Sequence, residues 1–184
     1  DILPPEALEL DLKNYSQSDF GELAPRGFRR PYKCTPMELI VDDEIMRLSR
    51  YPQHEDIPIK EIEDPGSVSM DVENPDFSNR GGKIKCEDEK VSKWNYIDNL
   101  AASGFFSNGY ADDTLNVKKI DKNSCTVEFS EAVMFGIKSN SNTRYHFINV
   151  LEEMKCEKEY YIDKKNKKLY FIPPKEFGKT SSIW

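Results

Sequence analysis

Residues 115–129 read LNVKKIDKNSCTVEF, and this stretch indicates the fold most directly. Apolar side chains recur through residues 115–120 and 126–129, and residues 121–124 between these runs are polar. Short runs rich in alternating apolar residues predict strands, and a polar tetrapeptide between two such runs predicts a turn. The stretch is therefore expected to form an antiparallel β-hairpin.

Two more hairpins are expected on either side of this one. Residues 37–41 and 44–48 flank the turn Asp42-Asp43, and residues 160–163 and 169–172 flank a lysine-rich turn at 164–168. Pro173 and Pro174 are expected to end the last strand, because proline has no N–H to donate to a β-ladder. Helical spacing of apolar residues occurs only within 89–102 and 145–154.

These patterns predict a mainly β chain. Antiparallel hairpins are expected to form a sandwich or barrel-like module with one or two short helices. We expect residues 1–184 to form a single domain. A long loop is expected at about 63–83, where prolines and glycines are frequent and periodicity is weak.

Composition excludes several classes of protein. The chain has 184 residues, 11% of them aromatic, which is too high a share for a disordered segment. The net charge of −7 argues against a nucleic-acid partner, because phosphate contacts need a basic face. No run of 18 apolar residues occurs, so no membrane span is expected.

The four cysteines leave two alternatives open. Cys34, Cys86, Cys125 and Cys156 include no CxxC pair, so a zinc or thioredoxin-type site is not expected. They are either buried reduced thiols or two disulfides with any of three connectivities. Asn14-Tyr15-Ser16 is a candidate glycosylation sequon. The even cysteine count, the sequon and a start typical of a processed chain favour a secreted or extracellular protein.

Motifs for catalysis and cofactors are missing from the sequence. The two histidines, His54 and His146, lie in different predicted elements, and no nucleophile-elbow or phosphate-loop pattern occurs. The acidic clusters at 42–44 and 112–113 lack the spacing of a calcium loop and are interpreted as solvated turns. We therefore assign no catalytic residue, no metal site and no cofactor.

Aromatic side chains are the best candidates for ligand binding, because an exposed ring can stack on a sugar. Trp94 is assigned to the core, since it falls on an apolar face. If a ligand surface exists, the loops at 105–110 and 63–83 are expected to carry it. The candidate ligand-binding residues are Phe105, Phe106, Tyr110 and Trp184.

Several short phrases follow one another in an order known from one group of proteins. They are DFGELAPRGF at 19–28, PMELIVD at 36–42, MRLSRYP at 46–52, NVLEEM at 149–154, YYID at 160–163 and KLYFIPP at 168–174. Over about residues 8–175, this order resembles the β-rich module of large right-handed parallel β-helix proteins. Many of those are glycoside hydrolase-like or polysaccharide lyase-like.

The resemblance implies that a β-helix would carry the carbohydrate groove, with the β-rich module packed against it. No coil repeats of a β-helix are visible in this sequence, so its catalytic carboxylates have no counterpart here. We therefore expect a non-catalytic extracellular module, paired with a β-helix companion chain or domain. The alternatives are a secreted, lectin-like carbohydrate-binding protein and, third, a glycan-active enzyme.

Overall fold

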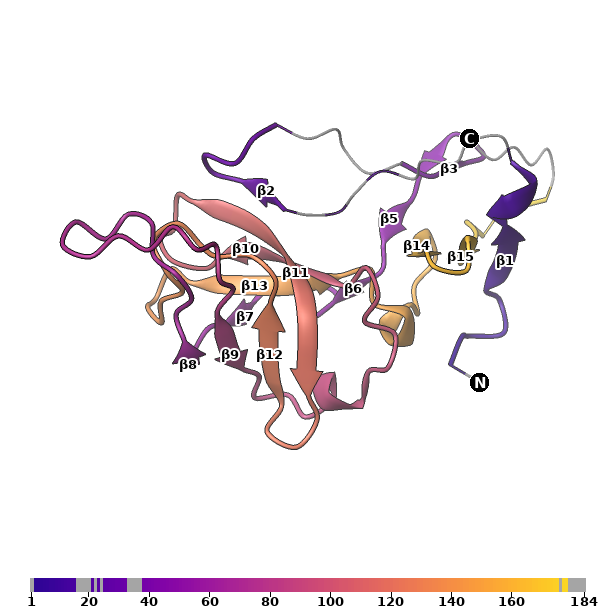
Figure 1. Cartoon of the computed structure of the whole chain (residues 1–184). Helices are drawn as coiled ribbons and strands as arrows, with labels where there is room; N and C mark the ends of the chain where they lie inside the picture. The colour runs from indigo at the N-terminus through magenta and orange to yellow at the C-terminus, as the bar shows by residue number, and fades with distance from the viewer. Residues whose placement is uncertain are drawn as a thin grey trace.

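The structure is a computed structural model that describes residues 2–15, 21, 23, 25–32, 38–175 and 177–178, without the side chain of Asn14. Strands dominate it, as the sequence predicted. The helical elements of the described residues are three single 3-10 turns, η1 (Leu12–Asn14), η2 (Val91–Lys93) and η3 (Leu151–Glu153). The chain is therefore mainly β, with its strands in separate, mostly antiparallel sheets (Figure 1).

The larger sheet has nine strands in the order β6-β13-β10-β11-β12-β9-β8, with β2 also paired to β11 and β7 to β13. All of these pairings are antiparallel. The strands are β2 (Arg26–Gly27), β6 (Arg50–Tyr51), β7 (Ile57–Pro58), β8 (Glu61–Asp64), β9 (Lys83–Lys85), β10 (Ala101–Phe105), β11 (Asp112–Asp121), β12 (Thr126–Phe129) and β13 (Arg144–Ile148).

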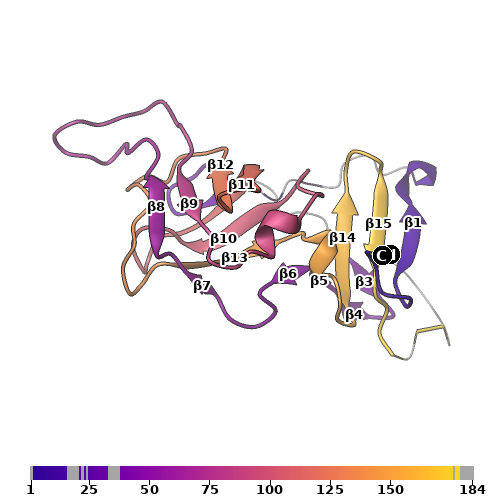
Figure 2. The same ribbon diagram turned by 90° about the horizontal axis from the view of Figure 1, so that it is seen from below.

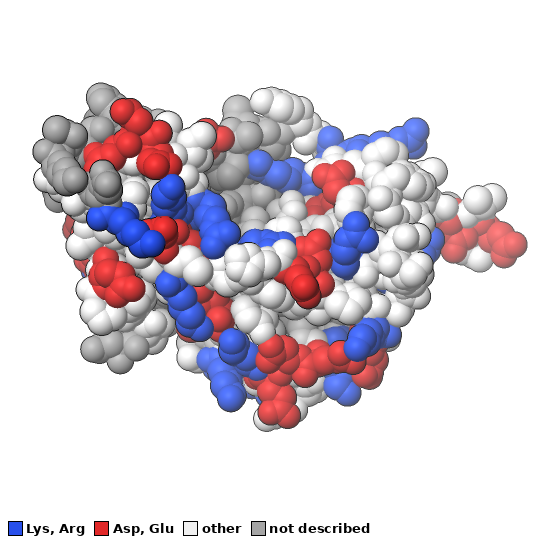
Figure 3. Space-filling view, turned by 180° about the vertical axis from the view of Figure 1, so that it is seen from behind, with Lys and Arg blue, Asp and Glu red and all other residues white. Residues whose placement is uncertain are grey.

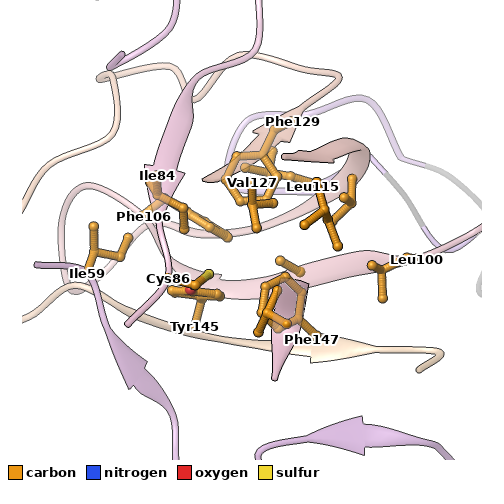
Figure 4. Packing of buried hydrophobic residues seen from close by; sticks show 14 of the residues in the cluster. Ile59, Ile84, Cys86, Leu100, Phe106, Leu115, Val127, Phe129, Tyr145 and Phe147 are labelled. Carbon is orange, nitrogen blue, oxygen red and sulfur yellow. The ribbon is translucent and has the colours of Figure 1, made fainter. Parts of the chain in front are cut away.

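The larger sheet folds over itself in a sandwich-like manner. Strand β11 pairs with β10 through its first half and with β12 through its second half, and the register shifts between Val117 and Lys119. Such a bulge bends a strand and increases its twist. As a result, Phe147 and Tyr145 of β13 belong to the same buried cluster as Val127 and Phe129 of β12 (Figure 4).

The smaller sheet has four strands in the order β1-β15-β14-β5 and lies to one side of the larger one (Figure 2). Its strands are β1 (Leu8–Asp11), β5 (Arg47–Leu48), β14 (Glu159–Asp163) and β15 (Lys168–Phe171). The β5–β14 pairing is parallel and the other two are antiparallel. A two-stranded ribbon pairs β3 (Ile40–Val41) with β4 (Glu44–Ile45), and its Val41 is buried in one apolar cluster with Ile162 and Leu169 of the smaller sheet.

All three predicted hairpins are present among the described residues. Strands β11 and β12 pair across the turn after Asp121, β14 pairs with β15, and β3 pairs with β4. The first hairpin is shorter than predicted, because residues 47–48 leave it to join the smaller sheet as β5.

Both predicted helices are wrong. Within 89–102 only η2 is helical, and residues 101–105 form the strand β10, which is paired on both sides by β11 and β13. Within 145–154 only η3 is helical, and residues 144–148 form β13. Apolar spacing was misleading here because pairing on two sides supplies hydrogen bonds for every backbone group of a central strand, which outweighs local propensity.

Of the two alternatives left open for the cysteines, disulfides are not observed among the described residues. Cys86 and Cys125 are buried free thiols, Cys156 is a half-buried free thiol, and Cys34 lies outside the described residues. The Sγ atom of Cys86 lies 3.0 Å from the Tyr145 hydroxyl oxygen. Burial raises the pKa of the Cys86 thiol to about 12. Two disulfides would need at least one pair among the three described cysteines, so the reduced-thiol alternative fits these three.

The surface carries both signs of charge. Figure 3 shows basic and acidic side chains intermixed on the face seen from behind. Many of the charged side chains form ion pairs. Two examples are Lys118 Nζ with Glu128 Oε1 at 2.6 Å and Lys60 Nζ with Glu87 Oε2 at 2.7 Å. No helix among the described residues has the length and apolar character that crossing a membrane requires.

Candidate functional site

A cleft of about 210 Å³ lies where four segments of the chain meet. The segment after β2 contributes Phe28 and Arg30, the β8–β9 loop contributes Asp76 and Phe77, and β11 contributes Asp113. The remaining lining residues are Arg29, Pro31, Ser67, Ser69, Asn79, Ala132 and Met134. Polar and aromatic groups therefore converge on one hollow, which is typical of a small-ligand site.

An ion pair forms one wall of the cleft. Arg30 donates from Nε to Asp113 Oδ1 and from Nη2 to Asp113 Oδ2 at 3.1 Å, and Nη2 also reaches the Ala132 carbonyl oxygen at 2.6 Å. Burial raises the pKa of Asp113 to about 6, although the Arg30 guanidinium acts in the opposite direction. Asp113 thus titrates in a range where carboxyl groups are usually fully ionised.

Close backbone approach positions Arg30. Gly27 has a φ of 135°, and a Cβ atom at this position would lie 2.4 Å from the Asp112 carbonyl oxygen. Only glycine adopts this conformation and fits this space. Strand β2 can therefore lie directly against β11, and Phe28 N–H donates to the Asp112 carbonyl at 2.9 Å. The turn that follows carries Arg30 back to Asp113.

The β8–β9 loop forms the opposite wall. It projects from one end of the molecule (Figure 1), and its ends are tied down by hydrogen bonds. Ser67 N–H donates to the Arg80 carbonyl at 2.9 Å, and Asn79 Oδ1 accepts from Ala132 N–H at 3.2 Å. At Gly81 a Cβ atom would lie 1.9 Å from the Phe129 carbonyl oxygen, so glycine is required for the loop to return along β12.

Two aromatic rings, Phe28 and Phe77, line the cleft, and further rings pack against Phe28. Phe28 contacts Tyr110 edge-on with ring centroids 5.8 Å apart, and it stacks with Phe135 at 6.4 Å. Tyr110 remains 66% exposed, and Phe77 across the cleft is 77% exposed. Arg29 lies over the Phe28 ring at 6.0 Å. These exposed rings beside polar groups are suited to the alternating apolar faces and hydroxyl edges of a sugar.

The cleft also holds a second carboxylate. Asp76 is exposed, and its pKa is lowered, chiefly because the Ser78 backbone N–H donates to it at 2.9 Å. Asp76 and Asp113 therefore have pKa values shifted in opposite directions. Among the described residues no cluster of histidine, cysteine, aspartate and glutamate is suited to a metal ion.

The sequence-predicted ligand residues are scattered. Tyr110 does not line the cleft but contacts Phe28, which does, and the predicted loop at 63–83 supplies five of the lining residues. Phe105 is half-buried on β10 under Arg144, whose guanidinium lies 5.3 Å from the ring. Phe106 is fully buried, 5.4 Å from the Phe129 ring, and is not available to a ligand. Trp184 lies outside the described residues, as does the side chain of the sequon residue Asn14.

Sequence reasoning missed Phe28, Arg30 and Asp113. Asp113 was interpreted as part of a solvated turn, but it lies in a strand and is only 6% exposed. The pairing of β2 with β11 brings Arg30 to it across more than eighty residues. One local signal was present, since a Gly-Phe-Arg-Arg-Pro phrase at 27–31 combines an aromatic, two cations and two turn residues.

Comparison with known proteins gives one distant likeness. No family model matches the chain, and no curated protein matches it. A solved structure named "Glycoside hydrolase" is similar with a TM-score of 0.55 and 10% sequence identity, over 98% of this chain and 29% of that one. The chain thus spans less than a third of the length of this relative. At this identity the likeness shows a glycoside-hydrolase-like β fold alone, and it does not extend to a parallel β-helix.

Proposed function

We propose that this chain is an extracellular, β-rich module of a larger carbohydrate-active protein, and that its cleft binds a glycan without cleaving glycosidic bonds. The observation that carries the proposal is the cleft itself, which is lined by exposed Phe77, by the Arg30–Asp113 ion pair and by Phe28, the ring that exposed Tyr110 contacts. The coverage of 29% of the glycoside hydrolase chain supports the place of this module within a longer protein.

The chemistry of the cleft supports a glycan over other small ligands. Apolar ring faces supply the contact area, while Arg30, Asp76 and Asn79 offer both donors and acceptors for hydroxyl groups. No phosphate-loop pattern is present, and charges of both signs line the cleft. A neutral, hydroxyl-rich ligand therefore suits it better than a strongly charged one.

Calorimetry against a panel of defined neutral and acidic oligosaccharides tests this function. We expect binding by at least one oligosaccharide, and we expect Tyr110→Ala and Phe77→Ala each to weaken it about tenfold, or about 1.4 kcal/mol. Tyr96→Ala is the matched control, because Tyr96 is 41% exposed and does not line the cleft. An equal loss in the control, or no binding at millimolar concentrations, would contradict the proposal.

The companion is a separate part of the proposal. A β-helix chain or domain is expected to pack against this module and to carry the catalytic groove. Native mass spectrometry of the protein from its source, with and without denaturation, would detect a longer polypeptide or a second chain. A single mass near 21.3 kDa would instead favour the free, lectin-like alternative. The same spectra report whether Asn14 carries a glycan.

One observation favours an enzyme as the second candidate function. Asp76 and Asp113 line the same cleft with pKa values moved in opposite directions, an arrangement found in acid–base pairs. If they act on glycosidic bonds, reducing ends will accumulate from a bound oligosaccharide, and Asp113→Asn will abolish this while binding persists. Binding without such products supports the non-catalytic module.

A further inference from the structure

A row of polar side chains crosses the larger sheet on the face away from its core. His146 of β13 lies directly opposite Ser103 of β10, and Ser103 lies directly opposite Thr114 of β11. On the other side of β13, Tyr145 pairs with Ile57, so Asp56 is the next residue in register and faces His146. Strand pairing therefore places Asp56, His146, Ser103 and Thr114 side by side.

One hydrogen bond lies at each end of this row. His146 Nδ1 lies 2.9 Å from Asp56 Oδ1, and Ser103 Oγ lies 3.0 Å from Thr114 Oγ1. Asp56 and Ser103 are on opposite sides of β13, so the imidazole edge that faces away from Asp56 is the one that carries Nε2. Side chains directly opposite in an antiparallel pair have Cβ atoms about 4.5–5.5 Å apart. His146 therefore lies between Asp56 and Ser103, with Nδ1 bonded to Asp56 and its Cβ directly opposite that of Ser103.

The protonation state of His146 fits a base. Burial is the largest influence and lowers its pKa, Arg50 lowers it further, and Asp56 acts in the opposite direction. A neutral imidazole that donates from Nδ1 to Asp56 leaves the Nε2 lone pair available. Arg50 Nη2 holds Asp56 Oδ1 at 2.6 Å, and Arg144 Nε lies 3.9 Å from Oδ2, so the carboxylate is oriented from two directions.

The row is accessible from solvent. The side chains of His146 and Asp56 are 22% and 25% exposed, and Ser103 is half-buried. The next residue pair along the same face is Phe105 with Arg144, an aromatic ring beneath a half-exposed guanidinium. An apolar surface and a cation therefore lie beside the hydroxyl.

We propose that Ser103, His146 and Asp56 form a nucleophile–base–acid array that hydrolyses small esters, independently of the glycan cleft. This combination of residue types and the Asp–His hydrogen bond are those of serine hydrolases, which arise on unrelated folds. Catalytic hydrogen bonds are often long before substrate binds, so Ser103 need not contact His146 in the free protein.

The chemistry balances within the array and its substrate. Ser103 Oγ forms a bond to the ester carbonyl carbon, its proton passes to His146 Nε2, and the carbonyl π pair becomes an oxyanion beside Arg144. When this tetrahedral intermediate collapses, the bond from the carbonyl carbon to the alcohol oxygen breaks. The alcohol leaves with the proton that His146 had taken. Water, deprotonated by the same imidazole, then releases the acid and restores the serine.

A fluorophosphonate probe on the whole chain, followed by peptide mapping, tests the assignment. We expect modification at Ser103, with His146→Gln slowing it more than tenfold, and slow hydrolysis of p-nitrophenyl acetate that follows His146 ionisation with pH. Ser92→Ala is the matched control, since this half-buried serine lies on η2 and its hydroxyl donates to the Glu89 carbonyl oxygen at 2.7 Å. Thermal melting of each variant separates loss of fold from loss of reactivity.

Peptide mapping of the labelled, unaltered protein shows whether Ser103 is modified, even if the variants unfold. An unmodified Ser103 at millimolar probe, or modification that His146→Gln leaves unchanged in a folded protein, overturns the proposal. Glycan binding that persists in Ser103→Ala keeps this result separate from the cleft.

Discussion

The larger and smaller sheets are stabilised in different ways. The larger sheet encloses an aromatic core, in which Trp94 and Phe147 meet edge-on at 5.0 Å and Tyr145 meets Phe147 at 5.2 Å. The smaller sheet buries mostly aliphatic side chains, together with a charged residue, Glu159, that is 0% exposed. Glu159 Oε2 accepts from the backbone N–H groups of Lys155 and Cys156, each at 2.9 Å.

One asparagine joins the two sheets. Asn149 follows β13 with a φ of 61°, and its buried side chain donates to the Asn99 and Ile162 carbonyls at 3.1 and 3.2 Å. Its Oδ1 accepts from Ile162 N–H at 2.9 Å. Burial of aromatic surface thus stabilises the larger sheet, whereas the smaller sheet and the joint between the sheets also depend on particular hydrogen bonds, which are harder to replace.

Breaking the aromatic core should have the largest effect. Phe147→Ala is expected to lower the free energy of unfolding by about 3–5 kcal/mol, because it removes a ring that contacts Trp94 and Tyr145 and leaves a cavity. Chemical denaturation measures this. Phe77→Ala, at a 77% exposed position, should change stability by less than about 0.5 kcal/mol. Similar losses in both variants would show that the core does not dominate.

Breaking the joint should have the next largest effect. Asn149→Ala leaves Ile162 N–H and two carbonyl groups without their partner, and we expect a loss of about 2–3 kcal/mol. Hydrogen exchange should show faster exchange at the Ile162 amide than in the core of the larger sheet. Asn74→Ala, on the exposed loop, is the control. Uniform acceleration across both sheets would mean that they unfold as one unit.

The smallest expected effect is a pH dependence of the free energy of unfolding that arises from Asp113 in the larger sheet. The pKa of Asp113 is about 6 in the folded chain and near 3.8 when exposed, so the folded state binds more protons between these values. The contribution of Asp113 to stability therefore falls as pH rises from 4 to 7, by about 2 kcal/mol at 1.36 kcal/mol for each pKa unit. The stability difference between the unaltered chain and Asp113→Asn should shrink accordingly. A difference that is constant with pH would show that Arg30 holds the carboxylate ionised throughout.

Local sequence patterns were sufficient to predict the β11–β12 and β14–β15 hairpins. Alternating apolar residues at 115–129 and a proline stop at 173–174 are local patterns, and the strands β11, β12, β14 and β15 formed where these patterns predicted. The loop at 63–83 also follows from local composition, because frequent proline and glycine oppose both strand and helix.

The strand at 101–105 and the contacts of Asp113 and His146 depend on tertiary structure. Residues 101–105 became a strand instead of a helix because β11 and β13 pair with them on both sides. Asp113 meets Arg30, and His146 faces Asp56 and Ser103, through registers between strands that lie far apart in the chain. Local patterns carry no information about such pairings, since their free energy comes from backbone hydrogen bonds and shared burial across the sheet.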